Sequence, residues 1–511
     1  MAEALPRAAV VAVVGAGAMG AGIAQIAAQA GHPVRLFDAR SGAAGEAVAR
    51  IAATFASMAA KGKMTPIEAR DAAARIEAVH AIGDCVSARL VVEAIVEDLD
   101  AKRELLRELD VVVAADAILA TNTSSLSITA IAAGSKHPGR VAGMHFFNPA
   151  PLMPLVEIVS GLSTDPPVAD TLFATAAAWG KLPVRASSTP GFIVNRCARP
   201  FYGEALKLAT ERAADCATLD AVMREAGGFR MGPFELMDLI GHDVNFAVTR
   251  SVWEAMFGDP RYAPSHLQRE LVAAGYLGRK SGRGFYDHGP GATVPAAAGE
   301  PPAQAPGRIA LHGEPGLLAP LVERIQRAGV TVGRRPAHPN FPDGALDTGG
   351  TWLALTDGRT ASARAAACLA PRLVLVDLAL DYAKATRVAI AATAGCDDAQ
   401  VASVAGALQA AGIAVSRIDD APGLVVMRTV AMLVNEAADA AHQGIASAAD
   451  IDTAMRSGVS YPRGPLAWGD EIGAGRVAAV LANLAACGDA VRYRISPRVA
   501  RVAQSGGRLA G

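Results

Sequence analysis

The chain of 511 residues has few cysteines, and none of its six cysteines lies in a CxxC pair. This spacing excludes a disulfide framework and a thiolate zinc site. We therefore expect that the protein binds no metal, that its thiols are reduced and that it is cytoplasmic. The chain also lacks a large excess of positive or negative charge, because its formal net charge at pH 7 is only −1. The balance gives no electrostatic reason to expect nucleic acid or an acidic membrane surface as a partner.

A true membrane-spanning run is lacking as well. Residues 8–31 are almost uncharged and long enough to cross a bilayer. Glycines crowd the middle of this segment, however, and Gln25 and Gln29 interrupt its second half. The preceding residues 1–7 make a poor signal-peptide start. We therefore predict a buried strand, a tight turn and a buried helix, and no membrane partner.

The first 188 residues have the pattern of a Rossmann domain. A β-branched run at Val10–Val14 precedes a glycine-rich turn, a helix over Ala21–Ala30 and a second strand over Val34–Asp38. Further strands are predicted at Leu90–Ala94, Ile118–Thr121, Val141–His145 and Leu155–Val159. Because these runs alternate with helical segments, we expect an α/β fold with a parallel, doubly wound sheet.

The glycine-rich turn is a candidate dinucleotide site. It consists of Gly15, Ala16, Gly17, Ala18, Met19 and Gly20. In this GxGxxG pattern the glycines allow a tight turn and close approach of the backbone to a pyrophosphate at the helix N-terminus. Alone the pattern is weak, but Asp38 ends the next strand, where an acid accepts hydrogen bonds from ribose hydroxyls and repels a 2′-phosphate. We predict NAD rather than NADP.

An internal repeat defines the remaining organisation. The sequence of residues 190–196 returns at residues 422–428, an offset of 232 that also aligns later acidic and glycine positions. We predict a helical domain at 189–288, a linker rich in Pro, Ala and Gly at 289–307, and a second helical copy at 421–511. The segment 308–420 between them resembles a decayed Rossmann domain. Its Pro315 and Leu318 stand where the first domain has Gly17 and Gly20, so we expect it to bind no dinucleotide.

His145 and Glu157 are the candidate catalytic pair. His145 ends a predicted strand, at the sheet edge where open α/β sheets bind ligands. Glu157 is a lone carboxylate inside an apolar run and requires a partner. A His–Glu pair would satisfy both groups, fix the imidazole tautomer and stabilise imidazolium. The alternative for an isolated histidine is an ordinary hydrogen-bonded core residue.

Several motifs together resemble the (S)-3-hydroxyacyl-CoA dehydrogenase family. They occur in order over residues 8–288 and include Thr121-Asn-Thr-Ser-Ser-Leu126, His145-Phe-Phe-Asn-Pro149, Thr189-Pro-Gly-Phe-Ile-Val-Asn-Arg196 and Gly278-Arg-Lys-Ser-Gly-Arg-Gly-Phe-Tyr286. The longer architecture is similar to bacterial members with a second helical copy. The resemblance implies NAD-dependent oxidation of 3-hydroxybutyryl-CoA or 3-hydroxyadipyl-CoA to the 3-oxoacyl-CoA, in fatty-acid β-oxidation or in phenylacetate and aromatic catabolism.

The resemblance also implies roles for individual residues. His145 would be the general base, Glu157 would orient it, and Ser124 and Asn195 would hold the substrate oxygen. The rest of the NAD site would be lined by Glu97, Lys102, Asn148 and Lys280, and CoA would contact Ser124, Thr54 and Lys61. Structural alternatives exist for several of them: Ser124 also suits a helix cap, Asn195 a polar helix position and Lys280 a solvated loop.

Three functions stay open at this point. The first is the 3-hydroxyacyl-CoA dehydrogenase with an acyl-CoA substrate, the second a related sugar-acid dehydrogenase that needs no CoA, and the third a non-catalytic protein that binds NAD or CoA. The duplication adds a structural hypothesis. The two helical copies would pack as a pseudo-dimer within one chain, although a homodimer is also possible. Whether the acyl group ends in a carboxylate is undecided.

Overall fold

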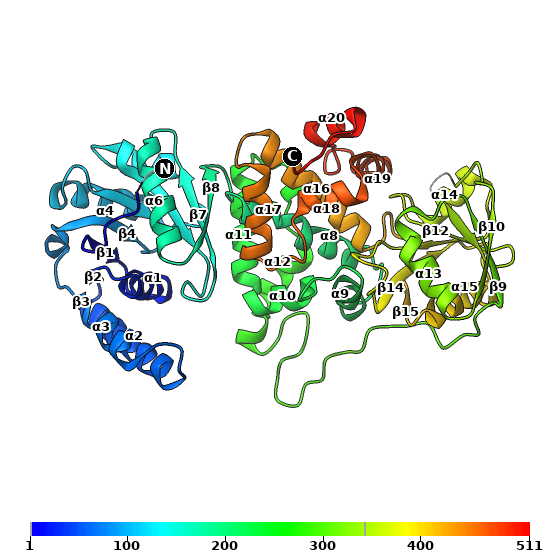
Figure 1. Cartoon of the computed structure of the whole chain (residues 1–511), viewed down its shortest axis with the longest axis horizontal. Helices are drawn as coiled ribbons and strands as arrows, with labels where there is room; N and C mark the ends of the chain where they lie inside the picture. Colours follow the sequence, from blue (N-terminus) through cyan, green and yellow to red (C-terminus); the bar gives the residue numbers. More distant parts are fainter. Residues whose placement is uncertain (1–2, 342–343) are drawn as a thin grey trace. The chain divides into compact units, whose positions relative to one another are not determined.

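The computed structural model describes residues 3–341 and 344–511. Its contacts divide the chain into two compact units (Figure 1). Unit 1 comprises residues 1–196 and 443–459, and unit 2 comprises residues 197–442 and 460–511. The second helical copy therefore contributes one segment, around helix α17 (Ala448–Gly458), to unit 1.

An eight-stranded sheet in the order β3-β2-β1-β4-β5-β6-β7-β8 forms the centre of unit 1 (Figure 1). The strands are β1 (Val10–Val14), β2 (Val34–Phe37), β3 (Ile76–Ala78), β4 (Ala88–Glu93), β5 (Ile118–Thr121), β6 (Val141–Phe146), β7 (Leu155–Ser160) and β8 (Leu182–Ser187). The strand order reverses between β1 and β4, and such a switch point is where doubly wound sheets bind ligands. All the predicted strands are confirmed, and β3 and β8 are additional.

The expectation of a wholly parallel sheet is wrong for one pair of strands. β6 and β7 run antiparallel, with His145 directly opposite Glu157. The connection between these strands covers only residues 147–154, which is too short for a parallel crossover of a dozen residues or more. The antiparallel register therefore brings the two side chains onto the same face of the sheet.

Helices cover both faces of this sheet. They are α1 (Ala18–Gln29), α2 (Ala43–Ala60), α3 (Pro66–Ala74), α4 (Leu99–Val112), α5 (Ile128–Ala132) and α6 (Pro166–Ala178). Alternate residues of β1 serve two cores: Val11 and Val13 pack with α1, α2 and α6, whereas Ala12 and Val14 pack with α4 and α5. Helix α1 begins three residues earlier than predicted, because Gly17 caps it and the glycine-rich turn leads directly into its first turn.

Unit 2 contains helices from both copies of the repeat. They are α8 (Arg199–Thr210), α9 (Cys216–Glu225), α10 (Pro233–Ile240), α11 (His242–Ala255), α12 (His266–Ala273), α16 (Val426–His442), α18 (Pro465–Ile472), α19 (Ala474–Ala486) and α20 (Pro497–Ser505). Helix α8 packs against α16, its counterpart in the repeat. A short helix, α7 (Val194–Cys197), comes just before α8 and is separated from it by one residue, with Pro200 in the first turn of α8.

The second sheet, also in unit 2, has seven strands among the described residues, in the order β10-β9-β11-β12-β13-β14-β15. They are β9 (Arg308–His312), β10 (Thr331–Arg335), β11 (Ala345–Asp347), β12 (Trp352–Leu355), β13 (Leu373–Val376), β14 (Arg387–Ala392) and β15 (Ala414–Arg417), with helices α13 (Ala319–Arg327), α14 (Ala361–Cys368) and α15 (Asp398–Ala410). Between β9 and β12 lies the short antiparallel strand β11, where the first sheet has the parallel strand β4. The expected fold class, a Rossmann domain and a helical domain followed by reduced copies of both, is confirmed.

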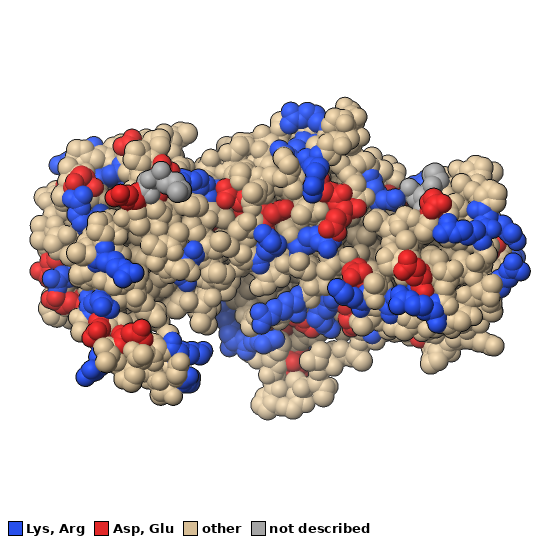
Figure 2. All heavy atoms as spheres, viewed as in Figure 1, with Lys and Arg blue, Asp and Glu red and all other residues tan. Residues whose placement is uncertain are grey.

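The surface carries both signs of charge. On the face drawn in Figure 2, basic and acidic side chains are interspersed. Over the residues that the structure describes, no helix combines the length and the apolar character that a membrane crossing requires.

Candidate active site

A buried histidine–glutamate pair lies near the carboxyl end of β6. His145 Nδ1 is 2.6 Å from Glu157 Oε2, and the two side chains are almost completely inaccessible to solvent. The other carboxylate oxygen, Glu157 Oε1, accepts hydrogen bonds from the backbone N–H groups of Ile193 (3.1 Å) and Val194 (3.0 Å). The charge of Glu157 is thus compensated from two sides, as a buried carboxylate requires.

This geometry fixes the chemistry that the imidazole can perform. If Glu157 accepts the Nδ1 proton of His145, the Nε2 lone pair is left free to take a proton from another molecule. The ionised carboxylate then stabilises the imidazolium that results. Aromatic rings hold the imidazole in place, since the centroids of Phe147 and Phe192 lie 4.5 and 5.8 Å from that of His145.

Ser124 and Asn195 lie close to each other in unit 1. The side-chain amide of Asn195 donates to the backbone oxygen of Ser124 (3.3 Å), and both residues are partly exposed. The Ser124 hydroxyl is 3.3 Å from Glu97 Oε1. The hydrogen bonds of both side chains are therefore long, and their polar groups can accept a new partner.

Glu97 links this loop to a buried ion pair. Its Oε1 atom accepts from Thr123 Oγ1 (2.7 Å) and from the Ser124 N–H (2.9 Å). Burial alone would raise the pKa of Glu97, but these hydrogen bonds and the nearby Lys102 lower it below its usual value. Lys102 is 1% exposed, and its Nζ lies 2.9 Å from both carboxylate oxygens of Glu93. Lys102 therefore acts within the protein, through Glu93 and Glu97.

The glycine-rich turn forms an open cradle after β1. A Cβ atom on Gly15 (φ +104°) or Gly20 would collide with backbone atoms, whereas a Cβ on Gly17 would meet nothing within 4 Å. There is therefore free space beside the backbone at Gly17. This space lies at the N-terminus of α1, whose first residues are Ala18 and Met19. Asp38 Oδ2 accepts the N–H of Ala16 (2.7 Å). Gly15, Gly17 and Asp38 line a hollow of about 510 Å³ beside β1, β2 and α4. The glycine-rich turn and Asp38 fit the phosphate and ribose groups of a dinucleotide.

The remaining predicted residues lie in different settings. Asn148 is exposed just after β6, and Thr54 and Lys61 are exposed on and just after α2, seven residues apart and so on one face of the helix. Thr54 Oγ1 donates to the Arg50 carbonyl of its own helix (2.9 Å). Lys280 belongs to unit 2, where its Nζ lies 2.5 Å from Asp243 Oδ1.

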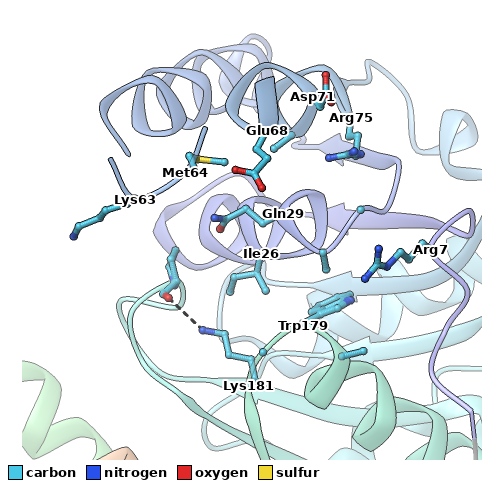
Figure 3. Close-up of a pocket in the computed structure, with 16 residues that line it drawn as sticks. Arg7, Ile26, Gln29, Lys63, Met64, Glu68, Asp71, Arg75, Trp179 and Lys181 are labelled. Atoms are coloured by element: carbon cyan, nitrogen blue, oxygen red, sulfur yellow. Dashed lines mark hydrogen bonds between the residues drawn. The ribbon is translucent and has the colours of Figure 1, made fainter. Parts of the chain in front are cut away.

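A separate hollow of about 620 Å³ lies between α1, α3 and the end of α6 (Figure 3). Several of its charged groups already have internal partners. Lys181 Nζ donates to the carbonyls of Ala150 (2.6 Å) and Met153 (2.8 Å), and Glu68 accepts the Thr65 N–H in a helix capping box. None of the predicted site residues lines this hollow, so we assign no function to it.

Two contributions to the site were not predicted. The backbone N–H groups that bind Glu157 cannot be recognised from the residue types that carry them, although Pro190-Gly191 predicts a turn just before them. Glu93 is not among the predicted site residues, yet it is 1% exposed and holds Lys102. Its position as the lone acid in an apolar strand is the same indication that identified Glu157.

The second sheet repeats the strand pairing of the first sheet but lacks the His–Glu pair. At the offset of 232 residues, His145 corresponds to Asp377 and Glu157 to Ala389. Asp377 donates its N–H to the Ala389 carbonyl (3.0 Å), so these two residues face each other as His145 and Glu157 do. The Asp377 side chain accepts the N–H groups of Val425 (3.0 Å) and Val426 (2.7 Å), the counterparts of Ile193 and Val194.

A dinucleotide cradle at the switch point of a Rossmann sheet, with a His–Glu pair at the same sheet edge, defines a nicotinamide-dependent dehydrogenase. Family comparison makes this specific. Residues 10–189 match the 3-hydroxyacyl-CoA dehydrogenase NAD binding domain, and residues 191–288 and 423–510 each match the C-terminal domain of that family. Residues 353–422 match the 3-hydroxybutyryl-CoA dehydrogenase reduced Rossmann-fold domain. The chain belongs to the 3-hydroxyacyl-CoA dehydrogenase family and is an NAD-dependent enzyme of that class.

Individual relatives agree with this assignment. The chain is 43% identical over 484 residues to 3-hydroxyadipyl-CoA dehydrogenase of Escherichia coli K12, covering 95% of each protein. A probable 3-hydroxybutyryl-CoA dehydrogenase of Bacillus subtilis is 42% identical over 276 residues, which cover 54% of this chain and 96% of that protein. A crystal structure described as 3-hydroxybutyryl-CoA dehydrogenase from E. coli K12 superposes with a TM-score of 0.88, at 42% identity and over 97% of this chain and 98% of that one.

Proposed function

We propose that this enzyme oxidises short-chain (S)-3-hydroxyacyl-CoA thioesters to 3-oxoacyl-CoA, with 3-hydroxybutyryl-CoA and 3-hydroxyadipyl-CoA as the candidate substrates. The buried pair of His145 and Glu157, 2.6 Å apart, is the observation that carries this proposal. A base with a fixed tautomer at the carboxyl edge of a dinucleotide-binding sheet is what removal of a hydroxyl proton requires.

Each residue of the site has a distinct task in the proposed reaction. His145 Nε2 takes the proton of the 3-hydroxyl group, and Glu157 stabilises the imidazolium. Ser124 and Asn195 bind the substrate oxygen, where a polarised oxyanion or hydroxyl needs donors. Bound NAD would supply the acceptor for the hydride that leaves C3. In the reverse direction the protonated His145 returns its proton to the oxygen of the 3-oxo group.

The cofactor and CoA contacts are proposed in the same way. Gly15, Ala16, Gly17, Ala18, Met19 and Gly20 hold the pyrophosphate and Asp38 the adenosine ribose, while Glu97, Lys102, Asn148 and Lys280 complete the NAD site. Lys102 contributes through its ion pairs with the two glutamates rather than by direct contact. Thr54 and Lys61 on α2 bind CoA together with Ser124. A cytoplasmic location agrees with buried, reduced thiols such as Cys85, whose pKa burial raises to about 11.

Thioester dependence is the test that separates this function from the sugar-acid alternative. NADH consumption is measured with acetoacetyl-CoA, with 3-oxoadipyl-CoA and with CoA-free 3-oxo acids, and NADH formation from NAD is measured with CoA-free hydroxy acids. Turnover of the thioesters alone supports the proposal. Turnover of the free acids at equal kcat/KM would favour the sugar-acid dehydrogenase, and tight NADH binding without any turnover would favour the non-catalytic alternative.

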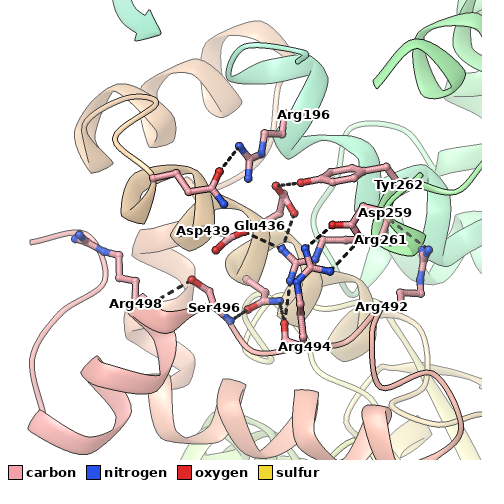
Figure 4. Close-up of polar contacts among 12 residues, drawn as sticks. Arg196, Asp259, Arg261, Tyr262, Glu436, Asp439, Arg492, Arg494, Ser496 and Arg498 are labelled. Atoms are coloured by element: carbon pink, nitrogen blue, oxygen red, sulfur yellow. Dashed lines mark hydrogen bonds and ion pairs between the residues drawn. The ribbon is translucent and has the colours of Figure 1, made fainter. Parts of the chain in front are cut away.

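We also propose that the chain has domains at 1–188, 189–288, 308–420 and 421–511, and that the two helical copies form a pseudo-dimer within unit 2. Buried glutamates at equivalent positions of α8 and α16 support it. Glu204 accepts from Arg492 (2.7 Å) and Tyr493 (2.9 Å) of the second copy. Glu436 accepts from Arg261 (3.2 Å) and Tyr262 (2.6 Å) of the first copy (Figure 4). Each copy thus binds the Arg-Tyr pair of the other.

Truncation tests the pseudo-dimer. Removing residues 289–511 would expose the apolar face of α8 and leave Glu204 without its arginines. We expect the truncated protein to dimerise or aggregate in light scattering. A well-behaved monomer would contradict the pseudo-dimer, and the full-length chain measured in parallel shows whether it also forms a homodimer.

A further inference from the structure

One segment of the second helical copy forms part of unit 1. Residues 443–459, which include α17, belong to this unit together with the first sheet, whereas the rest of the copy belongs to unit 2. The N–H of Ser187, at the end of the edge strand β8, donates to the carbonyl of Ile445 (2.8 Å), and Ile445 is buried. The segment therefore docks at the edge of the sheet that carries His145 and Glu157.

Helix α17 packs on the face of β7 to which the Glu157 side chain points. Side chains alternate along a strand, and those of Val156 and Ile158 pack in the core with α1 and α6. The side chains of Leu155 and Glu157 therefore point to the opposite face. Gly458, the last residue of α17, lies on this face, because a Cβ atom placed on it would be 2.6 Å from Leu155 Cδ2.

Gly458 is also close to the backbone segment that binds Glu157. A Cβ atom on Gly458 would lie 3.1 Å from Val194 Cγ2, which is closer than ordinary van der Waals contact. The N–H groups of Val194 (3.0 Å) and Ile193 (3.1 Å) are the two donors to Glu157 Oε1. The lack of a side chain at residue 458 thus permits the close approach of α17 to Leu155 and Val194.

The turn that presents these N–H groups requires support from its surroundings. Phe192, which precedes Ile193, has a φ of +47°, a left-handed conformation that is unfavourable for a bulky side chain. Such a conformation persists only where the surrounding structure imposes it. The helix that follows, α7, has only four residues and is too short to be stable alone. Packing of α17 against Val194, the first residue of α7, supplies such support.

The duplicated half of the chain contains the reciprocal contact. At the offset of 232 residues, Ser187 corresponds to Asp419 and Ile445 to Ala213. The Asp419 N–H donates to the Ala213 carbonyl (2.8 Å), and both residues belong to unit 2. Each helical copy therefore docks on the sheet of the other copy through the same hydrogen bond. The docking of α17 is thus a regular feature of the duplicated fold.

We propose that α17 supports the active site, with Gly458 as a positioning residue for Glu157 and, through Glu157, for His145. The helix contacts Leu155 and Val194 and so keeps the two N–H groups directed at Glu157 Oε1. This inference rests on the function proposed above for His145 and Glu157. It gives the second helical copy, whose own sheet lacks a His–Glu pair, a part in catalysis by the first sheet.

The test fills the space at residue 458 in the full-length protein. Gly458→Val adds three carbon atoms against Leu155 and Val194 and should displace the donors to Glu157. Because misplacement of a catalytic group by about 1 Å can lower the rate about 100-fold, we expect kcat with acetoacetyl-CoA and NADH to fall about 10- to 100-fold. The affinity for NADH, measured by fluorescence titration, should change less than about threefold, since three strands separate β1 and its glycine-rich turn from β7.

A compensating substitution distinguishes positioning from a general loss of structure. Leu155→Ala removes the side chain nearest to residue 458, so the double variant with Gly458→Val should regain a kcat within about fivefold of that of Leu155→Ala alone. The matched control is Ala449→Val, which adds a side chain of the same type at an exposed position of α17. This control should change neither kcat nor the affinity for NADH.

Several results would overturn the proposal. If Gly458→Val does not fold, Gly458→Ala takes its place and should lower kcat about three- to tenfold. An unchanged kcat in the Gly458 variant would show that α17 does not position Glu157. A parallel loss of NADH affinity, or no regain of kcat in the double variant, would show a general disruption of unit 1 instead. Absence of turnover in the wild type would refute the proposed function itself, whereas an active wild type that tolerates the change at residue 458 refutes only the role of α17.

Discussion

Replacing Glu157 by glutamine isolates the contribution of one negative charge to catalysis. The amide has the size of the carboxylate, so its oxygen can still accept the N–H groups of Ile193 and Val194. Its NH₂ group then points at His145 Nδ1, which has to become an acceptor. The imidazole proton moves to Nε2, and the atom that should receive the substrate proton is already protonated.

The expected loss follows from this change of tautomer and from the loss of charge. The hydrogen bond of 2.6 Å is in the range of charge-assisted bonds, which are worth about 1.5–3 kcal/mol. That energy alone corresponds to roughly a 10- to 150-fold loss. The wrong tautomer adds to it, and the equivalent acid-to-amide change in a serine protease lowers kcat about 10⁴-fold. We therefore expect Glu157→Gln to lower kcat by about 10³- to 10⁴-fold.

The assay is NADH consumption with acetoacetyl-CoA at saturation, with the affinity for NADH measured by fluorescence titration. We expect unchanged NADH affinity and a KM within a few-fold of the wild type, since the charge is used in the transition state. The matched control is Asp377→Asn, which alters the carboxylate that holds the equivalent N–H groups in the second sheet and should leave kcat unchanged. A Glu157→Gln enzyme that retains more than about a tenth of the wild-type kcat would refute the assigned role.

Three further predictions concern other residues. His145→Gln should bind NADH as the wild type does and lose at least about 10³-fold in kcat; survival of turnover would show that another group is the base. Asp38→Ser should raise the ratio of kcat/KM for NADPH to that for NADH by about tenfold or more, because repulsion of the 2′-phosphate disappears; an unchanged ratio would contradict its assignment. Asp220 on α9 is buried, and burial raises the pKa of its carboxyl group from 3.8 to about 7. Between these two pH values the carboxyl group is protonated in the folded state and ionised in the unfolded state. The free energy of unfolding should fall as pH rises from about 4 to 7, by about 4 kcal/mol at most, in the wild type and not in Asp220→Asn.

The sequence predicted the sheet well where burial determines residue type. Val10–Val14 and Ile118–Thr121 are continuous apolar runs with the same bounds in the structure. The antiparallel pairing of β6 with β7 was not predicted, although the shortness of the connection between them contains that information. The partnership of His145 and Glu157 was inferred from the cost of a lone buried carboxylate, and the structure adds that their opposite register is what brings them together.

The ion pairs that join the two helical copies could not be predicted. The residues next to Arg261 and Arg492 in the sequence do not identify the buried glutamates that pair with them, Glu436 and Glu204. Pairing in a folded interior depends on contacts between segments that lie more than 170 residues apart in the chain, such as Arg261 with Glu436.

The duplicated sheet shows that Glu157 performs two tasks that can be separated. In the first sheet this carboxylate holds the N–H groups that precede a helix and also orients His145. In the second sheet Asp377 holds the equivalent N–H groups and has Ala389, not a histidine or an acid, opposite it. The need to satisfy buried N–H groups thus persists where the catalytic partner is absent. A carboxylate that holds these N–H groups is consequently no proof of catalysis. The histidine opposite Glu157 is the residue that distinguishes the candidate active sheet from its copy.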